Sequence, residues 1–242
     1  GDSVTSDNSV TSEKNVAIHR YVIMANGKGI RWNDYLGIPK HLISVEEETL
    51  LERIVRQVTE RNPTAEIIIS SSDPRCETPG AIRYIPRRNE IELDRFVPEL
   101  LCDGICFLYG DTYYTDQAMD IIFSTERSTM TFFGTKKSLV AVKSWDRAEF
   151  SHHLSVVRTA YLTGQISTCK GWQVYRSYVG LPLEGGSVSG LAVTEGILIG
   201  DKSLRKHEVV SDEEPLVHLS DETRDFNRPH DLTNFYIRTE NN

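Results

Sequence analysis

The sequence predicts an α/β fold in which helices flank a single mixed, mainly parallel sheet. Short apolar runs at residues 17–25, 65–70 and 104–108 are typical of strands buried on both faces of a parallel sheet. Helical patterns lie between these runs, and strands that alternate with helices favour parallel pairing. The chain has 242 residues, of which 39% are hydrophobic, and this is enough for one domain with a full core.

The individual elements follow from periodicity and capping signals. Residues 44–61 place leucine, isoleucine and valine at helical spacing, with acids in the first turn and arginines later. Thr115 or Asp116 would cap the helix that follows. In chain order we expect strands at 17–25, 65–70, 104–108, 129–133 and 139–144, and helices at 44–61, 92–102, 115–123, 147–163 and 231–238. The glycine-rich residues 180–200 give no clear pattern, and we place no strand there.

Composition excludes several classes of protein. The net charge of −8 argues against a nucleic-acid partner, because phosphate contacts need a basic surface. No run approaches the roughly 20 apolar residues of a membrane span, and no signal-peptide core precedes residue 20, so we expect a cytoplasmic protein without a membrane partner. Residues 1–15 are polar and should form a solvated leader before one domain at 16–242. We expect structural rather than metal-binding roles for the four cysteines, Cys76, Cys102, Cys106 and Cys169.

The first candidate site follows the first strand. The apolar run ends in the turn Ala25-Asn26-Gly27-Lys28-Gly29, and the cations Arg31 and Lys40 come next in the sequence. Glycines let backbone N–H groups approach phosphate oxygens closely, and the two cations would neutralise the phosphate charge. The turn lacks the G-K-[ST] of a P-loop and the third glycine of the dinucleotide fingerprint. The alternative is an ordinary helix-entry turn flanked by solvated surface charges.

Two acidic segments and one serine segment complete the pattern. Asp111 follows a buried strand in Tyr109-Gly110-Asp111-Thr112, where it is suited to hold Mg²⁺, or alternatively to cap the next helix. Residues 225–232 (DFNRPHDL) contain Asp225 and Asn227, and they also fit a plain capped helix start. Ser71, within Ser70-Ser71-Ser72, ends a strand at the same edge and could contact a nucleobase or simply begin a loop.

Taken together and in this order, these segments resemble the sugar-nucleotide nucleotidyltransferases. That family has a GT-A-like, Rossmann-like fold and includes cytidylyltransferases and the molybdenum-cofactor guanylyltransferases. Its opening pattern A-G-x-G-x-R, followed by P-K, is matched by residues 25–31 and 39–40. Its central glycine–aspartate pair is matched by Gly110-Asp111, and its closing D-x-D-T-P-E-D-L is approached by residues 225–232.

The resemblance implies a reaction and a set of roles. An acceptor phosphate would attack the α-phosphorus of an NTP, and pyrophosphate would leave. CTP is favoured as the NTP because compact members are often cytidylyltransferases. A sugar-1-phosphate or a similar phosphorylated small molecule for surface-glycan precursors is the expected acceptor. The implied catalytic residues are Arg31, Lys40 and Asp111; the nucleotide-binding residues are Ala25, Asn26, Gly27, Lys28, Gly29, Ser71 and Gly110; the Mg²⁺ ligands are Asp111 with Asp225 or Asn227; and the candidate acceptor contacts are Lys136, Lys137 and Lys143.

Two departures from the family pattern keep alternatives open. Asn26 stands where members usually have a small residue, and Asn227 stands where the late metal aspartate is expected. A non-catalytic nucleotide-binding protein of the same fold is therefore one alternative. A GT-A glycosyltransferase is another, although the single acid at Asp111 replaces the D-x-D expected there. A homodimer is common in this family, and no residue pattern here indicates one.

Overall fold

The structure is a computed structural model that describes residues 16–26, 40–135, 138–184, 215–219 and 223–225, with the backbone alone at Lys40, Arg224 and Asp225. Its centre is a seven-stranded sheet with the order β10-β8-β9-β6-β1-β4-β5. The strands are β1 (Arg20–Met24), β4 (Glu66–Ser70), β5 (Ile82–Tyr84), β6 (Ile105–Tyr109), β8 (Met130–Gly134), β9 (Leu139–Ser144) and β10 (Leu216–His218). The helices are α2 (Leu50–Arg61), α3 (Asp116–Ser124), α4 (Arg147–Leu162) and α5 (Gly171–Val179).

The sheet is mixed and mainly parallel, which confirms the predicted fold class. Strand β1 pairs in parallel with β4 on one side and with β6 on the other. Strands β5 and β10 also run parallel to their neighbours, β4 and β8. Strand β9 runs antiparallel to both β6 and β8.

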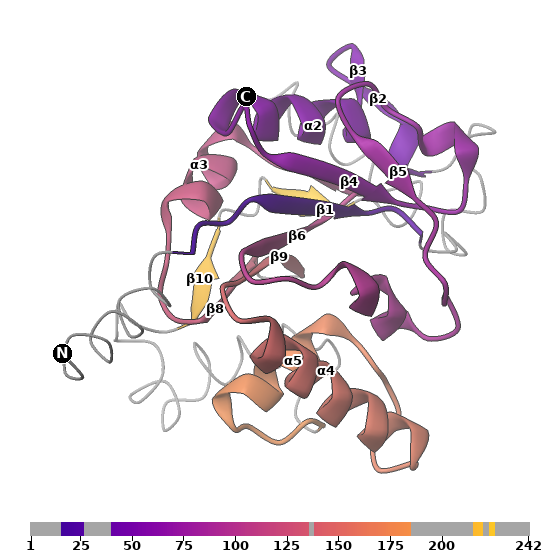
Figure 1. The fold of residues 1–242 in the computed structure, drawn as a ribbon, viewed down its shortest axis with the longest axis vertical. Coiled ribbons are helices and arrows are strands. Elements are labelled where there is room, and N and C mark those ends of the chain that lie inside the picture. The colour runs from indigo at the N-terminus through magenta and orange to yellow at the C-terminus, as the bar shows by residue number, and fades with distance from the viewer. Residues whose placement is uncertain (1–15, 27–39, 136–137, 185–214, 220–222, 226–242) are drawn as a thin grey trace, which may run out of the picture.

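Helices cover both faces of the sheet, as Figure 1 shows, with α2 and α3 on one side and α4 and α5 on the other. Strand β1 lies between these layers, and its residues alternate between the two cores. Val22 and Met24 belong to the core under α4 and α5, and Tyr21 and Ile23 belong to the core under α2 and α3. The apolar β1 run thus reflects burial on two faces, as expected for a central parallel strand.

Helix α2 begins later than predicted. Thr49 caps it, accepting from the Glu52 N–H while the Glu52 side chain accepts from the Thr49 N–H. The six residues before it form a short hairpin of β2 (Ser44–Val45) and β3 (Glu48–Thr49), with Glu46 and Glu47 at positive φ. The prediction of a helix from residue 44 was therefore wrong, because the capping box overrides the acidic run as a start signal.

Other differences involve short elements. The helix predicted at 92–102 is instead a pair of 3₁₀ turns, η4 (Glu92–Arg95) and η5 (Pro98–Leu100). Strands β5 and β10 have three residues each, too few to show a period, and the sequence did not predict them or α5. Residues 231–238 and most of 180–200 lie outside the described part of the protein. None of the described helices is both long and apolar enough to cross a membrane.

Candidate active site

The order of strands marks one place at the sheet edge where a ligand would bind. From β1 the chain continues to β4 on one side, and it later returns to β6 on the other side. Such a change of direction leaves a crevice outside the carboxyl ends of the two flanking strands. These ends lie at Met24 and Tyr109, which are direct partners in the β1–β6 register, and they point to the right in Figure 1. Two of the predicted motifs begin there, at Ala25 and Gly110.

The backbone at this edge is tightly packed. The Ala25 N–H donates to the Ser70 carbonyl at 2.9 Å, and the Gly110 N–H donates to the Met24 carbonyl at 2.9 Å. A Cβ at Gly110 would lie 2.9 Å from the Met24 oxygen and 3.2 Å from the Ala25 Cβ. A side chain at position 110 would push β1 and β6 apart, and this close approach explains the glycine before Asp111.

Asn26 joins the first loop to the ends of two other segments. Its side-chain oxygen accepts from the Ser72 N–H at 2.9 Å and from the Ser72 hydroxyl at 2.8 Å. Its main-chain oxygen accepts from the Asn89 side chain at 2.9 Å. Ser71, one residue earlier, is buried, and its N–H donates to the Tyr84 carbonyl at 2.9 Å. The loop ends after β1, β4 and β5 are thus held together by polar contacts.

The segment beyond Asp111 pairs with a distant one. Strand β7 (Thr112–Tyr113) runs antiparallel to β11 (Arg224–Asp225), and Asp225 lies opposite Thr112. Cα atoms of opposite residues in such a pair are roughly 4.5–5.5 Å apart. Asp111 is the residue before Thr112, so the backbone positions of the two predicted metal ligands are neighbours. The segments that carry them are more than one hundred residues apart in the sequence.

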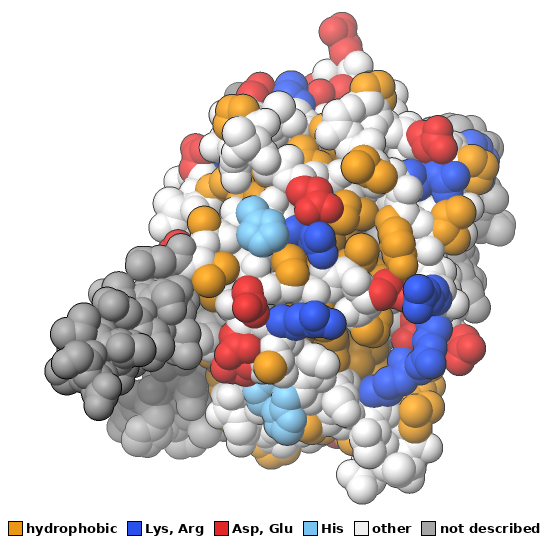
Figure 2. Space-filling view, in the orientation of Figure 1, with side chains coloured by type: hydrophobic (Ala, Val, Ile, Leu, Met, Phe, Trp, Pro, Cys, Tyr) orange, Lys and Arg blue, Asp and Glu red, His pale blue; other side chains and the backbone are white. Residues whose placement is uncertain are grey.

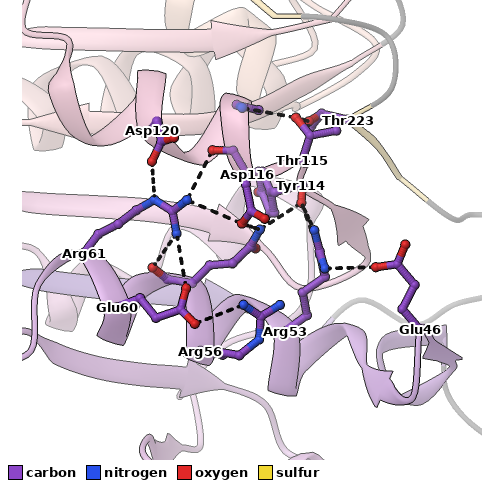
Figure 3. A network of polar contacts seen from close by, with 12 residues as sticks. Glu46, Arg53, Arg56, Glu60, Arg61, Tyr114, Thr115, Asp116, Asp120 and Thr223 are labelled. Atoms are coloured by element: carbon purple, nitrogen blue, oxygen red, sulfur yellow. Dashed lines mark hydrogen bonds and ion pairs between the residues drawn. The ribbon is translucent and has the colours of Figure 1, made fainter.

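Buried polar side chains of α2 hold the segment after Asp111 in place (Figure 3). The Tyr114 carbonyl accepts from Arg53 Nε at 3.2 Å, from its second guanidinium nitrogen at 3.0 Å and from Gln57 Nε2 at 3.0 Å. Arg53 and Gln57 are both buried. The Tyr114 hydroxyl donates to the Val140 carbonyl and accepts from the Tyr109 N–H. Tyr114 thereby connects the end of β6 to α2 and β9.

A second contact secures the returning segment. Thr223, which is fully buried, lies just before β11. Its hydroxyl accepts from the Thr115 N–H at 3.0 Å and lies 3.2 Å from the Thr115 hydroxyl oxygen, as seen in Figure 3. Thr115 is also the cap of α3, accepting from the Ala118 N–H. The start of α3 therefore fixes where β11, and with it Asp225, approaches Asp111.

The aromatic hydroxyls beside this segment stay protonated. Burial raises the pKa of Tyr114 well above its usual value. Burial also raises the pKa of Tyr113, and the Glu46 carboxylate adds to the shift although the Arg53 charge opposes it. Arg53 stacks on the Tyr113 ring at 4.2 Å, and the Tyr113 hydroxyl donates to Glu46. Both hydroxyls act as donors, Tyr114 to a backbone carbonyl and Tyr113 to a carboxylate, and are unsuited to act as bases near neutral pH.

The donors that this edge could offer can be compared with what a magnesium ion shared with a substrate requires. Within the described ranges, no three His, Cys, Asp or Glu side chains group closely enough to hold a metal by themselves. Mg²⁺ is usually bound through one or two carboxylates, with phosphate oxygens and water as its other ligands. A carboxylate at Asp111 with a second residue from the β11 segment matches that donor set.

The structure brings together five of the predicted site residues: Ala25, Asn26, Ser71, Gly110 and Asp111. The backbone of Asp225 joins them through β11, and that of Lys40 begins a 3₁₀ turn, η2 (Lys40–Leu42). Six predicted residues, together with Lys137, lie outside the described ranges: Gly27, Lys28, Gly29, Arg31, Lys136 and Asn227.

Lys143 does not belong to this edge, and its prediction as an acceptor contact was wrong. It lies on β9 opposite Cys106, near the start of β6 and away from Asp111. Its side chain is buried, and the ammonium group donates to the carbonyls of Ile122 at 2.7 Å and Thr125 at 3.0 Å. Burial lowers the pKa of Lys143. Its ammonium group binds carbonyls at the C-terminal end of helix α3 and is not available to contact a substrate at the other edge.

Sequence reasoning missed Asn89 and Thr223. Asn89 lies in an irregular loop, and Thr223 precedes a two-residue strand, so neither belongs to a periodic pattern. Their contacts join residues 63 and 108 positions apart in the sequence. A single sequence carries no signal for such pairs.

Comparison with known proteins identifies this architecture. No protein-family model matches the sequence, and no curated protein matches it. Among solved structures, CTP:phosphocholine cytidylyltransferase from Streptococcus pneumoniae is similar, with 13% identity, a TM-score of 0.50, and coverage of 92% of this chain and 99% of that one. The 4-diphosphocytidyl-2C-methyl-D-erythritol synthase from Anaerococcus prevotii is also similar, with 11% identity, a TM-score of 0.52, and coverage of 95% and 99%.

A hypothetical transferase from Thermus thermophilus has 14% identity and a TM-score of 0.53, with coverage of 88% of this chain and 99% of that one. Identities this low establish the fold and leave the reaction to be argued from the site. The similarity extends over nearly the whole length of each structure. The protein has the fold of nucleotidyltransferases of the cytidylyltransferase type, as the sequence resemblance predicted.

Proposed function

We propose that this protein is a nucleotidyltransferase that moves the nucleoside monophosphate of an NTP onto a phosphorylated small molecule. The observation that carries the proposal is the β7–β11 pairing, which brings Asp225 opposite Thr112 and so beside Asp111. That pairing lies at the carboxyl edge of the sheet, where the strand order changes direction. The architecture of solved cytidylyltransferases supports the same conclusion.

In the reaction one phosphorus–oxygen bond forms and another breaks. An oxygen of the acceptor phosphate forms a bond to the α-phosphorus of the NTP. The bond from that phosphorus to the oxygen that bridges the α- and β-phosphorus atoms breaks. Pyrophosphate leaves with the bonding electrons. A phosphate acceptor is already anionic near neutral pH, so the protein need not supply a general base. Its work is positioning and stabilisation of charge on the phosphate oxygens.

The proposed roles divide between the first loop and the two acidic segments. Backbone N–H groups of residues 26–29 bind the β- and γ-phosphates, and Arg31 stabilises the departing pyrophosphate. Lys40 contacts the α-phosphate or the acceptor phosphate. Asp111, with Asp225 or Asn227, would hold Mg²⁺, which would supply positive charge at the phosphate oxygens.

The substrates are proposed from chemistry and from similar proteins. CTP is the favoured nucleotide, because it appears in the name of one similar structure, CTP:phosphocholine cytidylyltransferase. Phosphocholine in that name is a phosphorylated small molecule, which is the acceptor class that we propose here. A sugar-1-phosphate for surface-glycan assembly remains the specific acceptor to be tested first.

The experiment is pyrophosphate release with Mg²⁺, each of the four NTPs, and a panel of sugar-1-phosphates, phosphorylated polyols and phosphocholine. Release with one NTP and one acceptor is the expected result. Release of a nucleoside diphosphate from an NDP-sugar, with none from any NTP, would instead indicate a glycosyltransferase. Nucleotide binding without any release across the panel would favour the non-catalytic alternative.

A further inference from the structure

The side chain of Asn26 has a fixed orientation. Its partner Ser72 offers a backbone N–H, which can only donate, so the atom of Asn26 that faces Ser72 must be the oxygen. The Ser72 hydroxyl donates to the same oxygen and uses its second lone pair. The Asn26 NH₂ group therefore points away from Ser72 as a pair of N–H donors. No described residue accepts a hydrogen bond from it.

The backbone of Asn26 is held from a second direction. Asn89 donates from its amide nitrogen to the Asn26 main-chain oxygen at 2.9 Å. We call Asn26, Ser72 and Asn89 the amide clasp. It joins the segments that follow β1, β4 and β5 at the carboxyl edge of the sheet.

The clasp is itself anchored to a helix. Asp94 accepts from the N–H groups of Glu90 at 2.9 Å and Ile91 at 3.1 Å, directly after Asn89. The other oxygen of Asp94 accepts from Arg158, which belongs to α4. Asp94 is buried, and the Arg158 side chain is partly exposed. The loop that presents Asn89 is thereby fixed to the layer of helices below the sheet.

We propose that Asn26 binds the NTP by donating a hydrogen bond from its NH₂ group to a nucleotide oxygen, with Ser72 and Asn89 as positioning residues. This inference rests on the proposed function. The donors lie directly before the glycine turn, at the edge where a nucleotide would bind. An NTP is rich in acceptor oxygens, and an amide whose own oxygen is occupied can offer it only N–H groups. Donation by this amide to the nucleotide would explain why asparagine stands at position 26 in place of a small residue.

Asn26→Asp separates binding from structure. The aspartate keeps an oxygen for both Ser72 donors, so the clasp and the melting temperature are retained. Its second oxygen replaces the NH₂ donors with an acceptor. The dissociation constant for the best-binding NTP, measured by calorimetry with Mg²⁺, should rise at least about fivefold, since a hydrogen bond to a charged or polar ligand typically contributes that much.

Salt separates a lost hydrogen bond from repulsion by the new charge. Repulsion between solvent-accessible charges weakens as salt shortens the screening length, whereas loss of a donor does not. The weaker binding should persist between about 0.1 M and about 0.5 M KCl, where the Debye length falls by about half. An effect that disappears at the higher salt would contradict donation by Asn26.

Asn89→Ala tests the positioning role. It removes the bond to the Asn26 carbonyl and leaves the Asn26 NH₂ group intact. The KM for the NTP should rise while the KM for the acceptor stays unchanged, a split that general destabilisation does not produce. Equal changes in both constants would overturn the positioning role.

Two outcomes distinguish this inference from the proposed function. If the wild-type protein binds an NTP and Asn26→Asp binds it equally well, the inference alone is wrong. If the wild-type protein binds no NTP, the proposed function fails and the inference fails with it. Should Asn26→Asp not fold, Asn26→Ala provides the second test. Unchanged NTP binding by that variant would overturn the inference, and weaker binding at an unchanged melting temperature would support it.

Discussion

At the scale of single residues, Lys143 shows how a buried cation can serve the fold alone. Its ammonium group donates to the carbonyls of Ile122 and Thr125 at the end of α3. It also lies 5.1 Å from the Trp145 ring centroid and 6.0 Å from that of Phe133. These contacts satisfy carbonyls that would otherwise end a helix inside the protein without partners.

Lys143→Met tests this structural role. The substitution keeps the apolar stem and leaves the two carbonyls unpaired, so the free energy of unfolding should fall by about 1–3 kcal/mol. Urea unfolding measures that change. Kinetic constants for the acceptor should stay at their wild-type values. A selective rise in the acceptor KM would indicate that Lys143 contacts the acceptor and would contradict the structural role.

The sequence placed Asp111 and Gly110 correctly at the sheet edge and misplaced Lys143, for one physical reason. A residue just after a parallel strand must lie at the carboxyl edge, and Asp111 follows β6 by two positions. Lys143 lies near the end of a strand whose direction the sequence did not reveal. Because β9 runs antiparallel to β6, that end is at the opposite edge of the sheet.

At the scale of elements, the β2–β3 hairpin holds backbone strain at its tip. Glu46 and Glu47 have φ values of 57° and 70°, in the left-handed region that disfavours side chains. Glu46 accepts from Arg53 at 3.2 Å and from the Tyr113 hydroxyl at 3.1 Å. Glu47 makes no hydrogen bond or ion pair within the part of the protein that the structure describes.

A matched pair of glycine substitutions separates strain from contacts. Glu47→Gly relieves the strain without losing a partner, so it should raise the free energy of unfolding by up to about 1 kcal/mol. Glu46→Gly relieves similar strain but removes the contacts to Arg53 and Tyr113. It should be less stable than Glu47→Gly by about 1 kcal/mol. Equal stability of the two variants in thermal or urea unfolding would show that the Glu46 contacts contribute nothing.

Strong local patterns predicted the long elements, and distant contacts decided the short ones. The sequence predicted strands β1, β4 and β6 and helix α3. Burial on two faces requires a run of apolar residues, and a helix cap requires a particular residue next to the helix, so both determine neighbouring positions in the sequence. The β7–β11 pairing depends on Thr223 reaching Thr115 across 108 positions. No local propensity encodes that contact, although it sets the backbone of the candidate metal site.

At the scale of the whole molecule, acidic and basic side chains lie interspersed over the described part of the face in Figure 2. The whole chain carries a net charge of −8, and this face shows both signs of charge. One ion pair in the structure has a buried carboxylate. Asp94 in η4 pairs with Arg158 in α4 and links the two segments of one layer.

Asp94 makes stability dependent on acid pH. Burial opposes its ionisation, but the N–H groups of Ile91 and Glu90 and the Arg158 charge hold the pKa of Asp94 below its usual value. A depressed carboxyl pKa adds stability above the unfolded value, about 3.9, and that stability is lost as the pH falls through the folded value. Asp94→Asn should therefore lower the free energy of unfolding at pH 7 by about 1–3 kcal/mol.

The difference between wild type and Asp94→Asn should shrink as urea unfolding is repeated from pH 5 down to about pH 3. Asp120→Asn is the matched control, because its carboxylate is largely exposed and meets Arg61 at the surface. That control should stay within about 0.5 kcal/mol of wild type. A difference for Asp94→Asn that is constant over this range would contradict the assigned role.

The catalytic role of Asp111 is tested by measuring Mg²⁺-dependent pyrophosphate release by Asp111→Asn, beside wild type and Asp120→Asn, with the active NTP and acceptor. We expect Asp111→Asn to fold normally and to lose at least about 100-fold in kcat/KM, because the variant would lose a ligand of the ion that stabilises charge in the transition state. Asp120→Asn should retain wild-type turnover. Wild-type turnover by a folded Asp111→Asn would contradict a catalytic site at the edge where β7 and β11 meet.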